Sequence, residues 1–96
     1  MPTWETLPGF LHDLKTLTPG QRGAFEQAVA KFVADLRAER FRKGLRVKKL
    51  VGHDDVWEMT WAGDGRATFH YGPSVTAGEQ HIVWRRIGTH DVFDRP

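Results

Sequence analysis

The hydrophobic pattern of this 96-residue chain changes its period once, near Leu45. Before Leu45 the apolar residues recur every three or four positions, which is typical of amphipathic helices. After Leu45 they alternate with polar residues, which is typical of half-buried strands. A chain with helices first and strands afterwards must bury both apolar faces against each other, so the pattern predicts a two-layer α+β domain.

The first half predicts a short strand and two helices. Residues 3–7 have the composition of a short edge strand, and a first helix is expected over residues 10–17. Thr18 and Pro19 match the N-cap and first position of a second helix of about five turns, which we expect to stop at Gly44. The apolar stripe of this second helix consists of Phe25, Val29, Phe32, Val33 and Leu36.

The second half predicts four strands, at residues 45–51, 56–62, 66–72 and 79–88. The short Gly- and Asp-rich separators favour consecutive antiparallel hairpins. The expected fold class is therefore α+β, with two N-terminal helices, after a short first strand, packed on one face of a mainly antiparallel four-stranded sheet. No linker or repeat interrupts this order, so we expect a single domain over residues 1–96.

Composition narrows the possible chemistry. The chain has no Cys, which excludes a disulfide framework, a thiolate nucleophile and a cysteine zinc site. Its five His residues show neither i, i+4 pairing nor HExxH-like spacing, so we expect no metal site. The sequence has no signal-peptide pattern and no apolar run near the roughly 20 residues of a membrane span. We therefore expect a cytoplasmic protein that makes no membrane contact.

Strand alternation predicts which face of the sheet carries polar groups. Trp57, Met59 and Phe69 fall on the side that must cover the helices, and their neighbours point the other way. The expected polar face therefore consists of Glu58, Thr60, Arg66, Thr68, His70, His81 and Arg85.

A cationic segment precedes this polar face. Between residues 37 and 49 there are seven Lys or Arg residues and one acid, although the formal net charge of the chain is only +2. For Arg37 to Lys43, a solvated helix end whose cations complement the helix dipole stays open as an alternative to a binding role. Lys48 and Lys49 are adjacent in a strand, so one of them must accompany the polar face.

Such residues suit the cleavage of RNA without a metal. A base removes the proton of a 2′-hydroxyl, the oxygen attacks phosphorus, cations stabilise the added charge, and an acid protonates the leaving 5′-oxygen. The candidates are Glu58 as base, His90 as acid or base, and Arg66 with Lys48 as an electrostatic clamp. Phe93 is a candidate to stack on an exposed base, a contact worth about 1–3 kcal/mol.

Structural roles remain open for several of these residues. Glu58 and Arg66 also suit a cross-strand ion pair of little energetic weight. His70 suits either a hydrogen-bonded sheet residue or a site residue, and His81 alone suits a surface residue. Phe93 also suits closing the core.

The layout and three segments, at residues 45–61, 65–72 and 85–93, resemble the RelE/ParE superfamily of bacterial type II toxins over essentially the full chain. A last strand that ends in Arg-Ile-Gly-Thr-His, with an aromatic residue soon after, looks most like the YafQ-type branch. This resemblance implies a ribosome-dependent mRNA endoribonuclease that is held inactive by a cognate antitoxin. It implies the ribosome and mRNA as further partners and no small-molecule cofactor.

The resemblance also implies site residues. His90 matches the catalytic histidine near the end of the family's sequence, and Phe93 matches its terminal aromatic residue, with two residues between them where the YafQ pattern has three. Glu58 stands in the place of a catalytic Asp, and Arg66 is similar to the arginine that opens the third strand. Thr60 stands where the YafQ branch has a His. The expected catalytic residues are His90, Glu58, Arg66 and Lys48, and the expected substrate-binding residues are Lys49, His70, Arg85, Phe93 and Arg46.

Two alternatives have the same fold. ParE-like members are gyrase inhibitors and need no nuclease residues, but His90 and its Gly-Thr-His context argue against that reading. A non-catalytic binding partner of an antitoxin is favoured by the departure at Thr60. The nuclease reading ranks first, the binding partner second and the gyrase inhibitor third.

Overall fold

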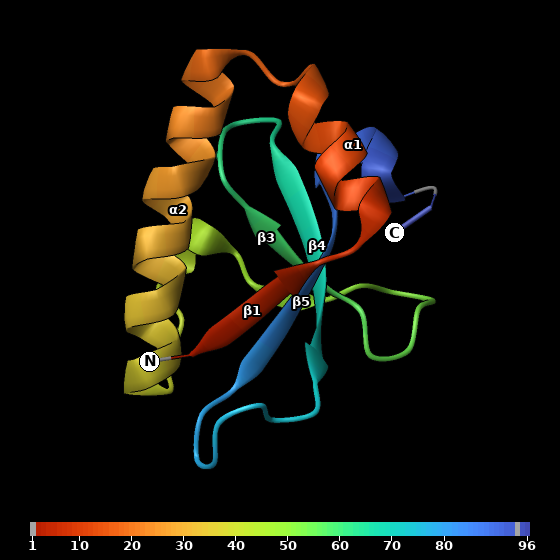
Figure 1. Cartoon of the computed structure of the whole chain (residues 1–96). Coiled ribbons are helices and arrows are strands. Elements are labelled where there is room, and N and C mark those ends of the chain that lie inside the picture. Colours follow the sequence, from red (N-terminus) through yellow and green to blue (C-terminus); the bar gives the residue numbers. More distant parts are fainter. Residues whose placement is uncertain (1, 94) are drawn as a thin grey trace.

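The computed structural model describes residues 2–93 and 95–96, and of these it leaves the side chains of His90 and Asp91 undescribed. Two helices lie on one side of a sheet, and the C-terminal end lies beside the first helix (Figure 1). The elements in chain order are β1 (Thr3–Thr6), α1 (Pro8–Thr16), α2 (Pro19–Ala38), the 3-10 helix η1 (Lys43–Leu45), β2 (Lys48–Lys49), β3 (Trp57–Thr60), β4 (Arg66–Gly72), β5 (His81–Gly88) and the 3-10 helix η2 (His90–Phe93).

The sheet has five strands in the order β1-β5-β4-β3-β2. The hairpins β2–β3, β3–β4 and β4–β5 are antiparallel, whereas β1 pairs with β5 in parallel. The predicted α+β class and the helical cover on one face are confirmed. The strand count differs from the predicted four because the short first strand joins the sheet at its edge.

The two ends of α2 are set by side chains. Thr18 accepts a hydrogen bond from the backbone of Gln21, whose side chain accepts one from Thr18 in return, so the helix begins with a capping box. The predicted stop at Gly44 is wrong, since α2 ends at Ala38 and Glu39 adopts a left-handed conformation with φ 58°. The Asp35 carboxylate receives the Arg42 backbone N–H and its guanidinium, each at 2.9 Å, which fixes the turn after the helix.

Aromatic rings fill the layer between helices and sheet. The Trp84 ring of β5 lies 5.4 Å from the rings of Phe25 and Phe32 on α2, centroid to centroid. It also lies 5.4 Å from Phe69 of β4 and 6.0 Å from Phe10 of α1. Offset and edge-to-face ring pairs of this kind stabilise a core beyond the area they bury. Trp84 therefore ties both helices to the centre of the sheet.

A β-bulge interrupts the pairing of β4 with β5. Thr68 pairs with Arg86 while the next residue, Phe69, pairs with Trp84, so Arg85 is the extra residue. Trp84 and Ile87 stay buried on either side of it. Neither arginine enters the core.

Within the described part of the chain, no helix is both long and apolar enough to cross a membrane.

Candidate active site on the open face of the sheet

The face of the sheet opposite the helices, called the open face here, carries a row of polar residues. Lys48 of β2 pairs with Glu58 of β3, and Glu58 pairs with Thr68 of β4. The Glu58 side chain is only 9% exposed, and its Oε1 lies 3.9 Å from Lys48 Nζ. The row places a buried carboxylate beside a cation, so a proton acceptor and a positive charge lie next to each other on the open face.

Lys49 does not join this row. It pairs with Trp57, and its Nζ lies 5.9 Å from the centroid of the indole ring in a cation–π contact. Because adjacent strand residues point to opposite faces, Lys48 alone of the two lysines meets Glu58. Lys49 therefore lies away from the expected substrate-binding position.

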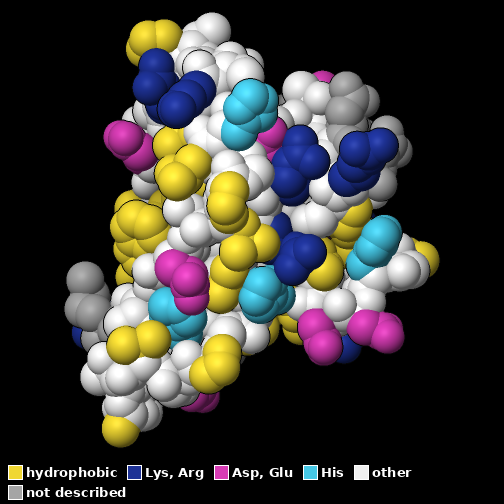
Figure 2. Space-filling view, turned by 45° about the vertical axis from the view of Figure 1, so that its right-hand side comes forward, with side chains coloured by type: hydrophobic (Ala, Val, Ile, Leu, Met, Phe, Trp, Pro, Cys, Tyr) yellow, Lys and Arg dark blue, Asp and Glu magenta, His cyan; other side chains and the backbone are white. Residues whose placement is uncertain are grey.

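His70 of β4 and Arg85 of β5 contact each other on the open face. Arg85 Nη1 donates a hydrogen bond to His70 Nδ1 at 3.1 Å. Burial, and secondarily the Arg85 charge, lower the pKa of His70 below its ordinary value. The structure thus brings these two predicted binding residues together and favours the uncharged imidazole. Lys, Arg and His side chains gather together on the face that Figure 2 presents.

Thr68 ends the polar row and contacts the same main-chain oxygen as Arg85. It is fully buried, and its hydroxyl donates to the main-chain oxygen of Pro96 at 3.1 Å. Arg85 Nε donates to the same oxygen at 3.0 Å. The chain therefore folds back so that Pro96 touches the centre of the open face. The sequence placed Thr68 on this face but gave no signal for the contact with Pro96.

The structure places Arg66 at the turn between β3 and β4. The residue is buried, and its Nη1 donates to the carbonyl oxygens of Gly65 at 2.9 Å and Gly63 at 3.3 Å. Among the described residues it makes no ion pair with Glu58. This geometry does not present Arg66 as a free clamp beside the carboxylate.

Arg86 also has a structural partner that sequence reasoning missed. Its guanidinium binds both carboxylate oxygens of Asp13 on α1, and the same carboxylate accepts the backbone N–H of Ile87 at 3.1 Å. This contact raises the pKa of Arg86 above its ordinary value. The Asp13 carboxylate therefore neutralises the charge of Arg86, and the contact fixes α1 to the end of β5.

The expectation that His81 is a surface residue is wrong. Only 6% of the residue is exposed, because β1 lies alongside it. Its Nδ1 lies 2.7 Å from Thr3 Oγ1, and its Nε2 lies 2.8 Å from Glu5 Oε1. These contacts tie β1 to β5, so His81 serves the sheet edge and not the open cluster.

The remaining expected site residues lie around this cluster. His90 begins η2, but its side chain lies outside the described residues. Phe93 ends η2 and is half-buried. Arg46 is exposed, with φ 49°, and lines a cavity of about 430 Å³ with Lys31 of α2 and Thr60 of β3. The buried Thr60 hydroxyl has no hydrogen-bond partner among the described residues.

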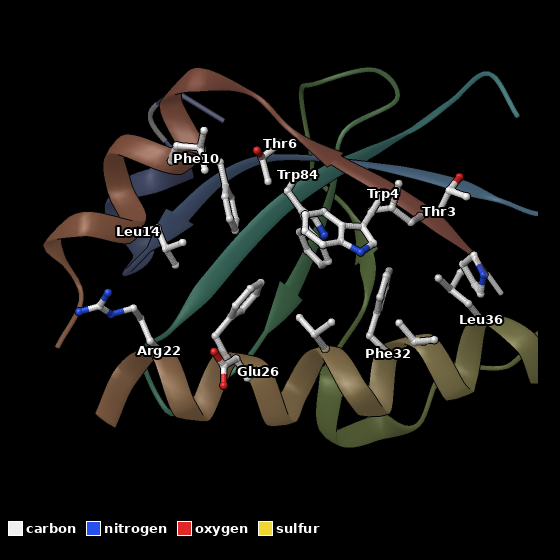
Figure 3. A pocket seen from close by; sticks show the side chains of 16 residues that line it. Thr3, Trp4, Thr6, Phe10, Leu14, Arg22, Glu26, Phe32, Leu36 and Trp84 are labelled. Atoms are coloured by element: carbon white, nitrogen blue, oxygen red, sulfur yellow. The ribbon is translucent and has the colours of Figure 1, made fainter. Parts of the chain in front are cut away.

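A larger apolar groove of about 540 Å³ lies on the other side of the sheet, where α1, α2 and β1 meet. Figure 3 shows side chains from all three elements pointing into it, with Arg22 and Glu26 together near one end. Trp4 of β1 lines this groove and is 65% exposed. The chain therefore leaves a large apolar surface uncovered here.

Among the described side chains, no three His, Asp or Glu residues are placed to hold a metal ion together.

The arrangement of the chain is similar to that of several solved toxins. It matches a toxin from Helicobacter pylori solved in a metal-bound form, with 24% identity and a TM-score of 0.67 over 96% of this chain and 98% of the other. It matches the E. coli DinJ-YafQ toxin-antitoxin complex with 13% identity and a TM-score of 0.65 over 95% of this chain and 94% of the other. It matches the RelB-RelE antitoxin-toxin complex from Methanococcus jannaschii with 17% identity and a TM-score of 0.62 over 95% and 98%.

No protein-family model and no curated protein sequence matches the chain, so the relationship is carried by the arrangement of the backbone. The likeness expected from the sequence is confirmed at this level, including the YafQ-type structures among the matches. The chain has the fold of the RelE and YafQ toxins.

Proposed function

We propose that the chain is the toxin of a type II toxin-antitoxin system and cleaves mRNA at the ribosome. The observation that carries the proposal is the cluster on the open face, where a buried carboxylate, a histidine and two cations lie on adjacent strands. The similarity to the RelB-RelE and DinJ-YafQ structures supports the toxin part of the proposal.

In the proposed reaction Glu58 takes the proton of the 2′-hydroxyl, and Lys48 beside it stabilises the negative charge of the attacked phosphate. Arg85, with the imidazole N–H of His70, stabilises the negative charge that develops at phosphorus. His90 protonates the leaving 5′-oxygen, a role assigned from the sequence resemblance. The reaction breaks the phosphorus–5′-oxygen bond and leaves a cyclic phosphate, so no oxidant and no cofactor is needed.

Four further residues complete the proposal. Phe93 stacks on a base next to the cleaved bond, a contact worth about 1–3 kcal/mol. Arg46 and Lys49 lie away from Glu58, and we assign them to backbone phosphates outside the cleavage site. Arg66 supports the reaction indirectly, through the β3–β4 turn that it holds.

The test is induced expression in growing bacteria, followed by primer extension across several mRNAs. Growth arrest with new cleavage sites is expected for the wild type, and His90→Ala should lower cleavage by about 10²–10⁴-fold. Growth arrest with intact mRNA would instead support a gyrase inhibitor. Unimpaired growth with both proteins would support a non-catalytic binding partner.

We further propose that the apolar groove binds an apolar segment of the cognate antitoxin. The groove exposes Trp4, and Arg22 and Glu26 line the part of it that lies away from Trp4, so charges of both signs are available to orient such a segment. Co-expression of an antitoxin candidate encoded beside the toxin should restore growth. Trp4→Ser should keep toxicity but weaken this rescue, whereas Val51→Ser, at a 95% exposed loop position, should change neither. Equal rescue of both variants would place the antitoxin elsewhere.

A further inference from the structure

Two buried carboxylates, Asp13 and Asp35, make the same set of contacts in two places. Asp35 accepts the guanidinium of Arg42 on both oxygens and also the backbone N–H of Arg42. Asp13 accepts the guanidinium of Arg86 on both oxygens and also the backbone N–H of Ile87. Each carboxylate side chain is 11% exposed. They differ in what they hold, since Asp35 closes the turn after α2 whereas Asp13 connects α1 to β5.

The connection made by Asp13 reaches the end of β5. Asp13 and Arg86 are 73 positions apart in the sequence, so their contact joins two distant segments. The N–H of Ile87, which donates to the same carboxylate at 3.1 Å, belongs to the last residue but one of β5. His90 begins η2 three positions later. A shift of the Ile87 backbone is therefore passed to His90 over a very short link.

Arg86 also holds the chain on the far side of η2. Its Nη1 donates to the carbonyl oxygen of Arg95 at 3.1 Å, two positions beyond Phe93, where η2 ends. The chain from Ile87 to Arg95 therefore leaves the Asp13–Arg86 ion pair and returns to it. A bidentate pair between a guanidinium and a carboxylate fixes orientation as well as distance, so it suits this anchoring role.

Side-chain packing leaves space between α1 and this segment. A cavity of about 560 Å³ lies there, lined by Asp13 and Arg86 and by Thr89 and Val92 of the segment. Val92 is buried, and its N–H donates to the carbonyl oxygen of Thr89 at 3.1 Å, so the turn of η2 has internal support of its own. The contacts of Asp13 and Arg86 therefore bridge a place that packing does not fill.

We propose that Asp13 is a positioning residue, which fixes the backbone of the segment that carries His90 through Arg86 and the N–H of Ile87. This inference rests on the proposed function, in which His90 protonates the leaving 5′-oxygen. Proton transfer needs a donor and an acceptor about 2.6–3.2 Å apart, and a misplacement of about 1 Å can cost about 100-fold in rate. Asp13 acts through Arg86 and takes no part in the proton transfers.

The experiment compares Asp13→Asn with its matched control, Asp35→Asn. Asparagine keeps the size of the side chain but loses the charge and one acceptor oxygen, and both positions are equally buried. Cleavage of one mRNA on purified ribosomes is followed over a range of toxin concentrations. Asp13→Asn should lower the maximal rate by about 10- to 100-fold, with the half-saturating toxin concentration unchanged.

Asp35→Asn should lower the melting temperature by a similar amount but cleave nearly like the wild type. Equal maximal rates of the two variants would overturn the proposal.

A second pair of variants keeps all charges and tests the geometry alone. A lysine at position 86 cannot reach both Asp13 oxygens and the Arg95 carbonyl oxygen, because its single ammonium group lacks the fork of a guanidinium. Arg86→Lys should therefore lower the maximal rate by about tenfold, whereas Arg42→Lys should not. This pair also tests the proposal if Asp13→Asn does not fold. Full activity of Arg86→Lys would contradict the anchoring role.

Amide hydrogen exchange measures the position of the segment without any cleavage assay. Asp13→Asn should speed the exchange of the Ile87 and Val92 amide protons, and Asp35→Asn should leave both unchanged. If the wild type cleaves no mRNA, the proposed function is rejected, and faster exchange would still support the anchoring of the segment by Asp13. If Asp13→Asn cleaves slowly but exchange is unchanged, the nuclease stands and the positioning role is rejected.

Discussion

Arg85 Nη1 donates a hydrogen bond to Nδ1 of His70, and this contact selects one tautomer of the imidazole. A guanidinium has donors only, so Nδ1 must hold a free electron pair, and the proton of the neutral ring lies on Nε2. Nε2 then donates and does not accept. His70 is therefore suited to holding an anionic oxygen, which leaves Glu58 as the proposed base.

The first prediction concerns the protonation of His70. Burial and Arg85 lower its pKa, so the folded protein binds fewer protons there than the unfolded chain just below the ordinary pKa of 6.5. The contribution of His70 to stability is therefore present above that value and is lost as the pH falls through it toward the folded pKa. NMR should show that the neutral ring of His70 carries its proton on Nε2. In an NMR titration, Arg85→Gln should raise the pH at which His70 is half protonated. A midpoint unchanged by Arg85→Gln would contradict the role of the arginine.

The second prediction concerns Glu58 as base. Glu58→Gln keeps the size and hydrogen-bonding ability of the buried side chain but cannot take a proton, so cleavage should fall by about 10²–10⁴-fold. The free energy of unfolding, measured by urea denaturation, should change little. Asp54→Asn, at an exposed position in the loop between β2 and β3, is the control for removing a carboxylate and should cleave like the wild type. Full activity of Glu58→Gln would assign the base to another group.

The third prediction separates Arg66 from the chemistry. Arg66→Ala leaves the carbonyl oxygens of the β3–β4 turn without their buried donor, so the protein should lose about 1–3 kcal/mol of stability. Arg40→Ala, just beyond α2 and exposed, should cost much less. Urea denaturation measures both. If Arg66→Ala abolished cleavage at unchanged stability, Arg66 would take part in the reaction as the electrostatic clamp that the sequence predicts.

The fourth prediction tests the same turn through its backbone. A Cβ at Gly65 would lie 2.5 Å from Cε2 of Trp61, which is closer than atoms can approach, whereas a Cβ at Gly63 would meet nothing within 4 Å. Gly65→Ala should therefore destabilise the fold by about 1–3 kcal/mol through overpacking, and Gly63→Ala should be tolerated. Thermal unfolding of the two variants gives the comparison, and equal melting temperatures would show that Trp61 moves aside.

Local patterns predicted most of the fold. Periodicity predicted the two helices and most of the sheet, but of the strand expected over residues 45–51 only Lys48–Lys49 is extended, because Leu45 ends a 3-10 helix. Thr18 marked the start of α2 because a cap acts within three residues. The end of α2 was missed because its left-handed residue is Glu39 and not a glycine. That conformation depends on the contact of Asp35 with Arg42, which no local rule contains.

The candidate site was predicted only where alternation controls it. Glu58 and Thr68 face away from the helices as expected, and alternation required that only one of the two adjacent lysines join them. The burial of His81 depends on the parallel pairing of β1, which brings Thr3 beside it from the other end of the sequence. Long-range pairing of this kind leaves no periodic signal in either segment.

The bulge at Arg85 shows how a strand can gain charge without losing a core position. In a regular strand two adjacent arginines would point to opposite layers, and one of them would displace an aromatic or aliphatic side chain. Here the inserted residue leaves Trp84 and Ile87 in the core, so both guanidinium groups stay outside it. The inserted residue therefore adds one guanidinium group to β5, and its deletion would remove one, with the hydrophobic packing preserved in both cases.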